Sequence, residues 1–226
     1  MNNKSHEVVI IGAVRTPIGT YKGILKNIKA DQLGSIAIRE VIKRSRINSD
    51  EIDEVIMGQV LTACNGQNPA RQAAINAGIS ISKPAYMVNQ VCGSGLRSVI
   101  SGYQSIKLGG AKKVISGGQE NMSLAPHSIY YREEKKISHD KLIDTMIHDG
   151  LLDAFNNYHM GVTAENIAEK FEILRDAQDN FALSSQKKAQ KAIENDKFKD
   201  ELVDVKINDT IINKDEHPRF DIKFQD

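Results

Sequence analysis

The sequence predicts an α/β protein built on a mostly parallel sheet that helices cover on both faces. Two observations over the first 120 residues predict this fold class. Short apolar, β-branched runs alternate with segments of helical period, and glycines or helix-capping residues stand between them. Strands that alternate with helices form βαβ units, so they run parallel and are buried. The chain of 226 residues is 40% hydrophobic and 26% charged, which is enough for a core.

Four strands and three helices are expected in this first part. The expected strands are residues 8–11, 55–57, 85–88 and 114–116. The helices between them lie around residues 33–41, 69–77 and 94–108. The second helix is the most sharply defined, because Asn68 is a good N-cap, Pro69 suits the first helical position and Gly78 closes the helix. The third helix ends at a pair of glycines.

The last 106 residues have a different pattern. Thr163 is expected to cap one helix whose apolar residues share a face, and Asp176 is expected to cap the next. Residues 202–207 partly alternate like a strand, and an Asn-Asp turn leads into residues 210–212, which predicts a hairpin. Residues 1–120 carry a net charge of +7 and residues 121–226 a net charge of −6, which favours a domain boundary near residue 120.

Composition excludes several classes of protein. The net charge of +1 argues against a dedicated binder of nucleic acid or of anionic membranes. Two cysteines cannot make a disulfide scaffold or a four-cysteine zinc site. No apolar run approaches the ~20 residues of a membrane span, and the start lacks the apolar core of a signal peptide. We therefore expect a cytoplasmic protein.

Cys92 is the strongest candidate for chemistry. A strand leads into it, two glycines follow, and a helix begins directly after, as in the nucleophile elbow of other folds. Gly93 and Gly95 are expected to let the backbone turn sharply and a substrate come close. The positive end of the helix dipole favours a thiolate there, and backbone amides can receive an oxyanion. The alternative is a small buried cysteine at a tight turn; the glycines and the placement favour the nucleophile.

The other candidates are weaker. Cys64 has no metal-spaced partner, which favours a structural role. The six histidines form no close pair, so no metal site is expected. His159 alone is more typical of a helix entrance than of catalysis, and Met160 alone is typical of a core. No Gly-x-Gly-x-x-Gly fingerprint is present, so no dinucleotide cofactor is expected.

Five motifs together resemble the thiolase family, in its biosynthetic branch of acetyl-CoA acetyltransferases. The motifs are Arg15-Thr16-Pro17-Ile18-Gly19, Asn68-Pro69-Ala70-Arg71-Gln72, Asn89-Gln90-Val91-Cys92-Gly93-Ser94-Gly95-Leu96, Gly117-Gly118-Gln119-Glu120-Asn121-Met122-Ser123 and Tyr158-His159-Met160-Gly161. Each is weak alone, but five in order across the chain are specific. A ketoacyl synthase is less favoured, because the last motif is typical of thiolases.

The resemblance implies a five-layer αβαβα fold of two similar halves with a loop domain inserted after the first. Residues 1–120 would be the first half, and residues 121–226 an incomplete loop domain that binds coenzyme A. Cys92 would be the nucleophile that acetyl-CoA acylates. A second acetyl-CoA would then attack the acetyl-enzyme and give acetoacetyl-CoA, or the reverse reaction would be thiolysis. Coenzyme A would be a substrate, and no prosthetic group is implied.

The resemblance also implies binding residues and an oligomer. Leu151, His159 and Met160 would line the pantetheine tunnel, and Arg219 would meet the adenine end of coenzyme A. The segment from about 123 to 147 would include a tetramerisation loop, so a homo-oligomer is expected.

The sequence departs from the family because the motifs of the second thiolase half are absent. Those motifs supply the histidine that activates the nucleophile, the cysteine that moves the α-proton and part of the oxyanion holes. Since general acid–base catalysis contributes roughly 10²–10⁴-fold, we expect the chain to be nearly inactive alone and to need a complementary C-terminal chain. An apolar face would then be exposed, which predicts self-association or a partner. The alternative is a non-catalytic remnant that binds coenzyme A weakly or associates with full-length thiolase.

Overall fold

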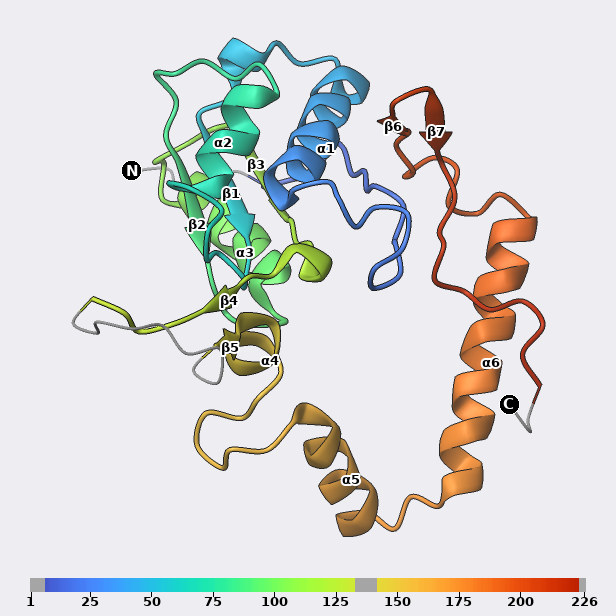
Figure 1. The fold of residues 1–226 in the computed structure, drawn as a ribbon. Coiled ribbons are helices and arrows are strands. Elements are labelled where there is room, and N and C mark those ends of the chain that lie inside the picture. Colours follow the sequence, from blue (N-terminus) through green and yellow to red (C-terminus); the bar gives the residue numbers. More distant parts are fainter. Residues whose placement is uncertain (1–6, 133–141, 224–226) are drawn as a thin grey trace.

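A three-stranded parallel sheet forms the centre of the fold (Figure 1). The computed structural model describes residues 7–132 and 142–223. The strands are β1 (Glu54–Gly58), β2 (Ala85–Val88) and β3 (Val114–Gly118), in the order β2-β1-β3. All three occupy positions that the sequence predicts, so the α/β class with a mostly parallel sheet is confirmed.

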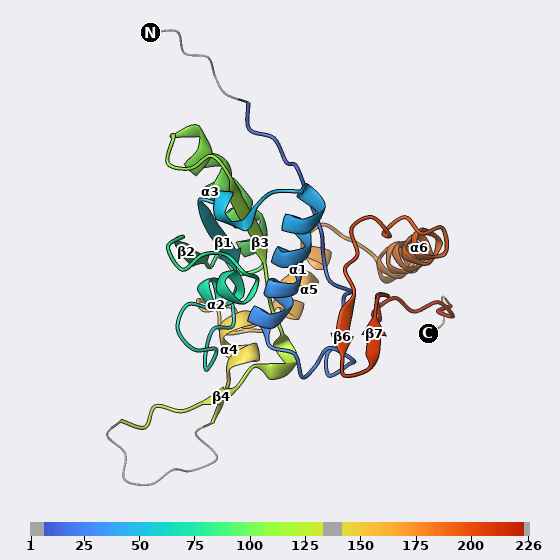
Figure 2. The same cartoon turned by 90° about the horizontal axis from the view of Figure 1, so that it is seen from above.

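Helices cover both faces of this sheet. α1 (Ala30–Ser45) and α2 (Pro69–Asn76) lie on one face, and α3 (Ser94–Lys107) lies on the other (Figure 2). All three are expected from the sequence. In β1 alternate residues point to opposite faces, and the strand is buried on both. A continuous apolar strand of this kind is typical of a parallel sheet between two helical layers.

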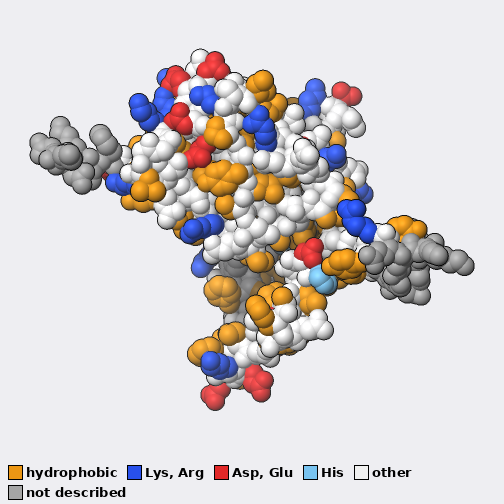
Figure 3. All heavy atoms as spheres, turned by 90° about the vertical axis from the view of Figure 1, so that its left-hand side faces the viewer, with side chains coloured by type: hydrophobic (Ala, Val, Ile, Leu, Met, Phe, Trp, Pro, Cys, Tyr) orange, Lys and Arg blue, Asp and Glu red, His pale blue; other side chains and the backbone are white. Residues whose placement is uncertain are grey.

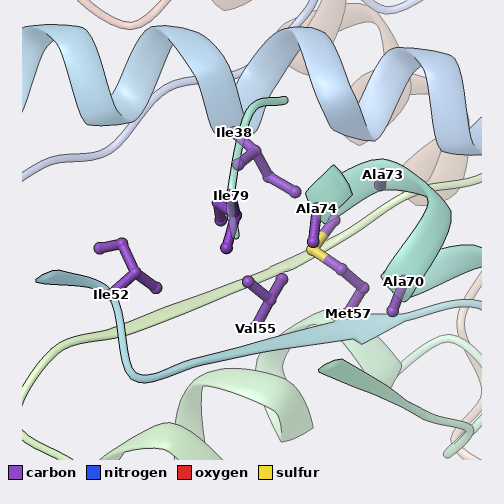
Figure 4. Close-up of a cluster of buried hydrophobic side chains, with 8 residues drawn as sticks. All are labelled: Ile38, Ile52, Val55, Met57, Ala70, Ala73, Ala74 and Ile79. Carbon is purple, nitrogen blue, oxygen red and sulfur yellow. The ribbon is translucent and has the colours of Figure 1, made fainter. Parts of the chain in front are cut away.

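The main core fills the space between the sheet and the first helical layer. Val55 and Met57 point up from β1 toward α1, where Ile38 meets them (Figure 4). The three alanines of α2 allow that helix to approach the strand closely. The buried cluster consists of Ile38, Ile52, Val55, Met57, Ala70, Ala73, Ala74 and Ile79.

Asn68 ties the beginning of α2 to β2. Its Oδ1 accepts from the amide of Arg71 at 3.1 Å, and its Nδ2 donates to the carbonyl of Ala85 at 2.9 Å. Its φ of 45° lies in the left-handed region, which asparagine tolerates better than alanine. We expect Asn68→Ala to lower the free energy of unfolding by about 1–2 kcal/mol, measured by urea denaturation.

A matched control for this prediction is Asn180→Ala. Asn180 also donates through Nδ2 to a backbone carbonyl, that of Asp176 at 2.8 Å, but it lies inside an exposed helix. Since alanine is the better helix former there, Asn180→Ala should leave stability unchanged within ~0.5 kcal/mol or raise it. Equal losses in both variants would contradict a capping role for Asn68.

The chain beyond β3 leaves the three-layer body in a wide arc and then returns to it (Figure 1). Neither α5 (Met160–Lys170) nor α6 (Arg175–Glu194) contains a buried residue. The remaining elements are two short 3₁₀ turns, Ser49–Glu51 and Met122–Leu124, then β4 (His127–Ser128), β5 (Ile143–Asp144), α4 (Thr145–Gly150), α5 (Met160–Lys170), α6 (Arg175–Glu194), β6 (Val205–Ile207) and β7 (Thr210–Ile212).

The hairpin β6–β7 packs back against the first part of the chain. Its pairing and its turn at Asn208 are as the sequence predicts. Val205 and Ile212 are buried against Leu33 of α1 and against Leu25, which precedes that helix. This second cluster joins residues about 180 positions apart in the sequence, so the end of the described chain is anchored on its beginning.

The predicted strand at residues 8–11 is wrong. The segment belongs to no strand, and the side chains of Val9, Ile10 and Ile11 are 62%, 80% and 61% exposed. A strand needs a neighbour to bond its amides and carbonyls. Among residues 7–132 and 142–223 no strand lies beside this run.

Both predicted caps in the second part are also wrong. α5 begins before Thr163, and its first amides are capped by His159, whose Nδ1 accepts from Gly161 N–H at 2.9 Å. α6 begins at Arg175, and Asp176 lies inside its first turn. Each helix starts earlier than the capping residue type suggests, because a histidine nitrogen can replace the usual side-chain oxygen and a helix can also begin without a side-chain cap.

α3 presents its small residues to the sheet and its large apolar residues outward. Ser94, Ser98 and Gly102 are the buried positions. A hydrophobic patch therefore lies on the outer surface of α3. Figure 3, which views the molecule from the left-hand side of Figure 1, shows apolar side chains gathered in the middle of that side. The exposed large apolar residues of α3 are Leu96, Val99, Ile100 and Tyr103. The apolar face that the sequence leads us to expect is thus exposed. None of the described helices is long and apolar enough to cross a membrane.

Candidate active site

The candidate site lies where the carboxyl ends of the parallel strands meet the beginning of α3. β1 ends at Gly58, and a Cβ atom on Gly58 would lie 2.4 Å from the carbonyl carbon of Ser94. β3 ends at Gly118, where a Cβ atom would lie 3.3 Å from the Cα of Gly95. Glycine at both strand ends lets them touch the first turn of α3. This edge is where open parallel sheets bind ligands.

Cys92 lies in the turn between β2 and α3, beside a strained residue. Val91 has a φ of 48°, in the left-handed region that a β-branched residue rarely adopts. Its amide donates to Asn89 Oδ1 at 2.9 Å, and its carbonyl accepts from the amide of Ser94 at 3.1 Å and from the hydroxyl at 2.6 Å. These bonds hold the strained turn and leave the Cys92 side chain exposed.

The predicted roles of the glycines in this turn need correction. Gly93 has a φ of −84°, which any residue adopts, and Gly95 lies within α3. The sharp turn is therefore made at Val91, and the glycines only keep the space beside it open. The amides of Gly93 and Ser94 donate to carbonyls within the turn, so neither is free for an oxyanion.

The exposure of the Cys92 side chain decides between the two interpretations of this residue, an accessible nucleophile or a buried structural cysteine. Because its side chain is exposed, the alternative of a buried structural cysteine is wrong. Cys64 is exposed too, with a φ of 59° in the loop after β1. The two residues differ in their setting, since only Cys92 lies at the beginning of a helix of 14 residues.

A buried polar cluster supports the same edge of the sheet. Gln59 follows β1 and Gln119 follows β3, and Gln119 Nε2 donates to Gln59 Oε1 at 2.9 Å. Glu120 Oε2 accepts from the amides of Val60 at 2.8 Å and Leu61 at 3.2 Å. This cluster fixes the loop after β1. No role for these residues is predicted from the sequence, although polar residues directly after buried strands are a signal of such a cluster.

Burial governs the protonation of Glu120. Burial raises the pKa of Glu120 above its ordinary 4.5, and the amides of Val60 and Leu61 oppose this only in part. The folded state therefore prefers the protonated carboxyl. We expect the free energy of unfolding of the wild type to fall as pH rises through the folded pKa of Glu120. In Glu120→Gln, which cannot titrate at this position, this pH-dependent decrease should vanish. Urea denaturation between pH 4 and 7.5 measures the difference.

Glu216→Gln is the control with the opposite sign. Amide hydrogen bonds from Thr20 and Ile24 lower the pKa of Glu216. Its contribution to stability is therefore present above its unfolded pKa and is lost as pH falls through the lowered folded pKa. The free energy of unfolding of the wild type minus that of Glu216→Gln should rise toward neutral pH. The same difference for Glu120→Gln should fall toward neutral pH. Parallel pH profiles for the two variants would refute the assignment for Glu120.

The predicted binding residues Leu151, His159 and Met160 lie together. The amide of Met160 donates to the carbonyl of Leu151 at 2.8 Å, and His159 forms an antiparallel bridge with Leu152. His159 Nδ1 accepts a hydrogen bond from the amide of Gly161 at 2.9 Å. A Cβ atom on Gly150, just before this group, would lie 3.5 Å from the Leu61 side chain in the loop after β1. The group therefore begins next to the strand edge that carries Cys92.

Arg219 lies far along the chain in an exposed segment. Its amide donates to Gln186 Oε1 of α6 at 2.9 Å. Arg219, Phe220, Asp221 and Ile222 line a hollow of about 330 Å³. No hydrogen bond or ion pair among the described residues joins Arg219 or His159 to Cys92. The structure thus places the predicted residues in three groups, at Cys92, at 151–160 and at 219.

The described residues offer no cluster of three or more histidine, cysteine or acidic side chains that could hold a metal ion. Part of the predicted tetramerisation loop, residues 133–141, lies outside the described residues.

Comparison with known proteins gives a consistent result. Residues 8–226 match the family described as thiolase, N-terminal domain. An acetyl-CoA acetyltransferase of Paracoccus denitrificans is 50% identical over 217 residues, which cover 94% of this chain and 56% of the relative. A probable acetyl-CoA acetyltransferase of Escherichia coli is 49% identical over 95% of this chain and 56% of its own length. The cytosolic acetyl-CoA acetyltransferase of Rattus norvegicus is 45% identical over 97% and 56%. The chain spans about half the length of these curated relatives.

Proposed function

The chain belongs to the thiolase family, and from this premise we propose that it carries the acyl-accepting cysteine of an acetyl-CoA acetyltransferase. The observation that carries the proposal is the setting of Cys92. Its thiol is exposed beside a strained turn, at the beginning of α3 and at the carboxyl edge of a parallel sheet. A sulfur held there can be reached by a thioester.

The chemistry divides into two steps. In the first, the Cys92 thiolate attacks the acetyl carbonyl of acetyl-CoA, an acetyl–sulfur bond forms, and the coenzyme A thiolate leaves and takes up a proton. In the second, a base removes an α-proton from another acetyl-CoA. The resulting carbanion attacks the acetyl-enzyme, a carbon–carbon bond forms, and the Cys92 thiolate leaves acetoacetyl-CoA. The covalent intermediate splits one difficult bond formation into two easier steps.

Coenzyme A would be held by residues of both the middle and the end of the chain. We assign Leu151, His159 and Met160 to the pantetheine arm, since their backbones are joined and the group begins beside the strand edge. We assign Arg219 to the adenine end. The division near residue 120, into a half that carries Cys92 and a region that binds coenzyme A, is part of this proposal. Coenzyme A is a substrate in this scheme, and no prosthetic group takes part.

Condensation would need further groups beyond Cys92. Among the described residues no histidine bonds to Cys92, and Cys64 lies in a separate loop. We assign the activating histidine and the second cysteine to a complementary C-terminal thiolase chain or segment. The exposed apolar face of α3 supports such a partner. A homo-oligomer and a cytoplasmic location complete the proposal.

The second candidate function is a non-catalytic thiolase chain that binds coenzyme A weakly or associates with full-length thiolase. The observation that favours it is the same exposed face of α3, because it offers a surface for association whether or not Cys92 reacts.

Mass spectrometry distinguishes these functions. The chain is incubated with acetyl-CoA, alone and with the C-terminal part of the Paracoccus denitrificans relative, and the mass of each cysteine-containing peptide is measured. An acetyl group on Cys92, with acetoacetyl-CoA formed only in the mixture, supports the proposed function. Unlabelled Cys92 in both samples would overturn it and leave the binding function.

A further inference from the structure

Arg15 forms a charged cluster with residues near the other end of the chain. Its Nη1 and Nη2 donate to Asp215 Oδ1 and Oδ2 at 2.7 and 2.9 Å, and its Nε donates to Glu201 Oε1 at 2.6 Å. The guanidinium also lies over the ring of Phe198, 5.0 Å from its centroid. The Asp215 side chain is only 6% exposed. Arg15 begins the Arg-Thr-Pro motif, to which the reaction assigns no role.

The segment that follows Asp215 is fastened to the loop after Arg15. Asp215 Oδ1 also accepts from the amide of Ile18 at 2.8 Å. Glu216 donates its amide to the carbonyl of Ile18 at 2.9 Å, and its carboxylate accepts from the amides of Thr20 and Ile24, both at 3.0 Å. Residues 215 and 216 are therefore docked by both their backbone and their side chains.

Arg219 lies four residues after Asp215 and is held at its own backbone by Gln186 of α6. Residues 215–219 thus run between two anchors, the Arg15 loop and α6. Pro218 restricts the short path between them. Moving the first anchor would shift the Arg219 backbone relative to the body that carries Cys92.

We propose that Arg15 is a positioning residue which acts through Asp215 to hold Arg219 where it meets the nucleotide end of coenzyme A. The inference rests on the proposed function, in which Arg219 binds that end. The bidentate geometry requires arginine, because a lysine ammonium cannot match both carboxylate oxygens. Burial alone would raise the pKa of Asp215, but its bonds to Arg15 and the Ile18 amide lower it, so the pair is charged at neutral pH.

The test compares binding of coenzyme A with binding of pantetheine, which lacks the nucleotide, by isothermal titration calorimetry. The chain is used whole, as wild type, Arg15→Lys, Asp215→Asn, the double variant and Arg219→Gln. We expect each single variant to weaken coenzyme A binding about tenfold and to leave pantetheine binding unchanged. The double variant should lose no more than either single variant, because Arg15 acts through Asp215.

Arg44→Gln is the matched control. Arg44 donates through Nη1 and Nη2 to the carbonyls of Asp200 and Leu202, in the same returning stretch, but does not touch residues 215–219. It should lower stability without changing the preference for coenzyme A over pantetheine. Equal weakening of both ligands in Arg15→Lys, or additive losses in the double variant, would overturn the inference. The inference would also be overturned if the wild type bound coenzyme A no more tightly than pantetheine.

Acetylation of Cys92 is measured on the same samples and reports separately on the proposed function. If Cys92 takes no acetyl group while the binding preference is present and Arg15→Lys removes it, the catalytic proposal fails and the positioning role stands. If Cys92 is acetylated and the variants keep the preference, the positioning role fails alone.

Discussion

Replacing Cys92 with serine is expected to abolish the transfer of an acetyl group from acetyl-CoA to this chain. Serine keeps the shape of the turn, but its hydroxyl is not ionised at neutral pH and no base bonds to it among the described residues. The rate of acetylation should fall by on the order of 10³-fold or more, the range seen when a covalent nucleophile is removed. Mass spectrometry after incubation with acetyl-CoA measures the rate, and acetyl-CoA labelled with ¹⁴C gives an independent count.

Cys64→Ser is the control for this prediction. Both thiols are exposed, so a small alkylating reagent should reach both, and exposure alone cannot explain a difference between them. Acetylation should continue in Cys64→Ser at the wild-type rate. If Cys92→Ser is acetylated as fast as the wild type, or if Cys64→Ser loses the label, Cys92 is not the acyl acceptor.

Gly58→Ala is expected to give the largest loss of stability among single substitutions near the site. The new Cβ would lie 2.4 Å from Ser94 C and 2.5 Å from Gly95 N. Both are backbone atoms of the first turn of α3, which cannot move aside as a flexible side chain can. Overpacking of this kind costs about 3 kcal/mol, and the turn that carries Cys92 would shift as well. Urea denaturation measures the loss, and alkylation of Cys92 reports on the turn.

Gly117→Ala provides the comparison, since it lies near the carboxyl end of β3, the strand that pairs with β1 in the same sheet. Its new Cβ would lie 3.8 Å from the nearest atoms, the Sδ and Cε of Met57, which is ordinary contact. The substitution should change the free energy of unfolding by less than ~1 kcal/mol. A similar loss in both variants would show that the close contact at Gly58 is not what limits this position.

Local signals explain which elements the sequence could predict. The three strands of the sheet and the three helices around it are each marked by their own residues, as Asn68, Pro69 and Gly78 mark α2. The hairpin at Asn208 is equally local. The run at residues 8–11 has the same β-branched composition, yet it is unpaired. The composition of a segment indicates which secondary structure it can form. Whether a strand pairs depends on a neighbouring strand, and the whole fold determines whether one is present.

The candidate site was predictable to the same extent. The position of Cys92 before a helix follows from the glycines around it, but the strained torsion falls on Val91, whose residue type argues against it. The bond between Gln59 and Gln119 joins two strands that are not consecutive. The pair of Arg15 and Asp215 spans 200 positions. No local pattern encodes such contacts, because the topology of the chain brings them together.

The arc of α5 and α6 has a consequence for the thermodynamics of ligand binding. Neither helix buries a residue, so tertiary packing stabilises both only weakly, and an isolated helix shorter than ~12–15 residues is marginal in water. α5, with 11 residues, falls below that length. A ligand held by His159 and Met160 at its first turn must therefore supply the entropy of ordering the helix as well as its own contacts. If coenzyme A binds there as proposed, its affinity would report how well ordered α5 is before the ligand arrives.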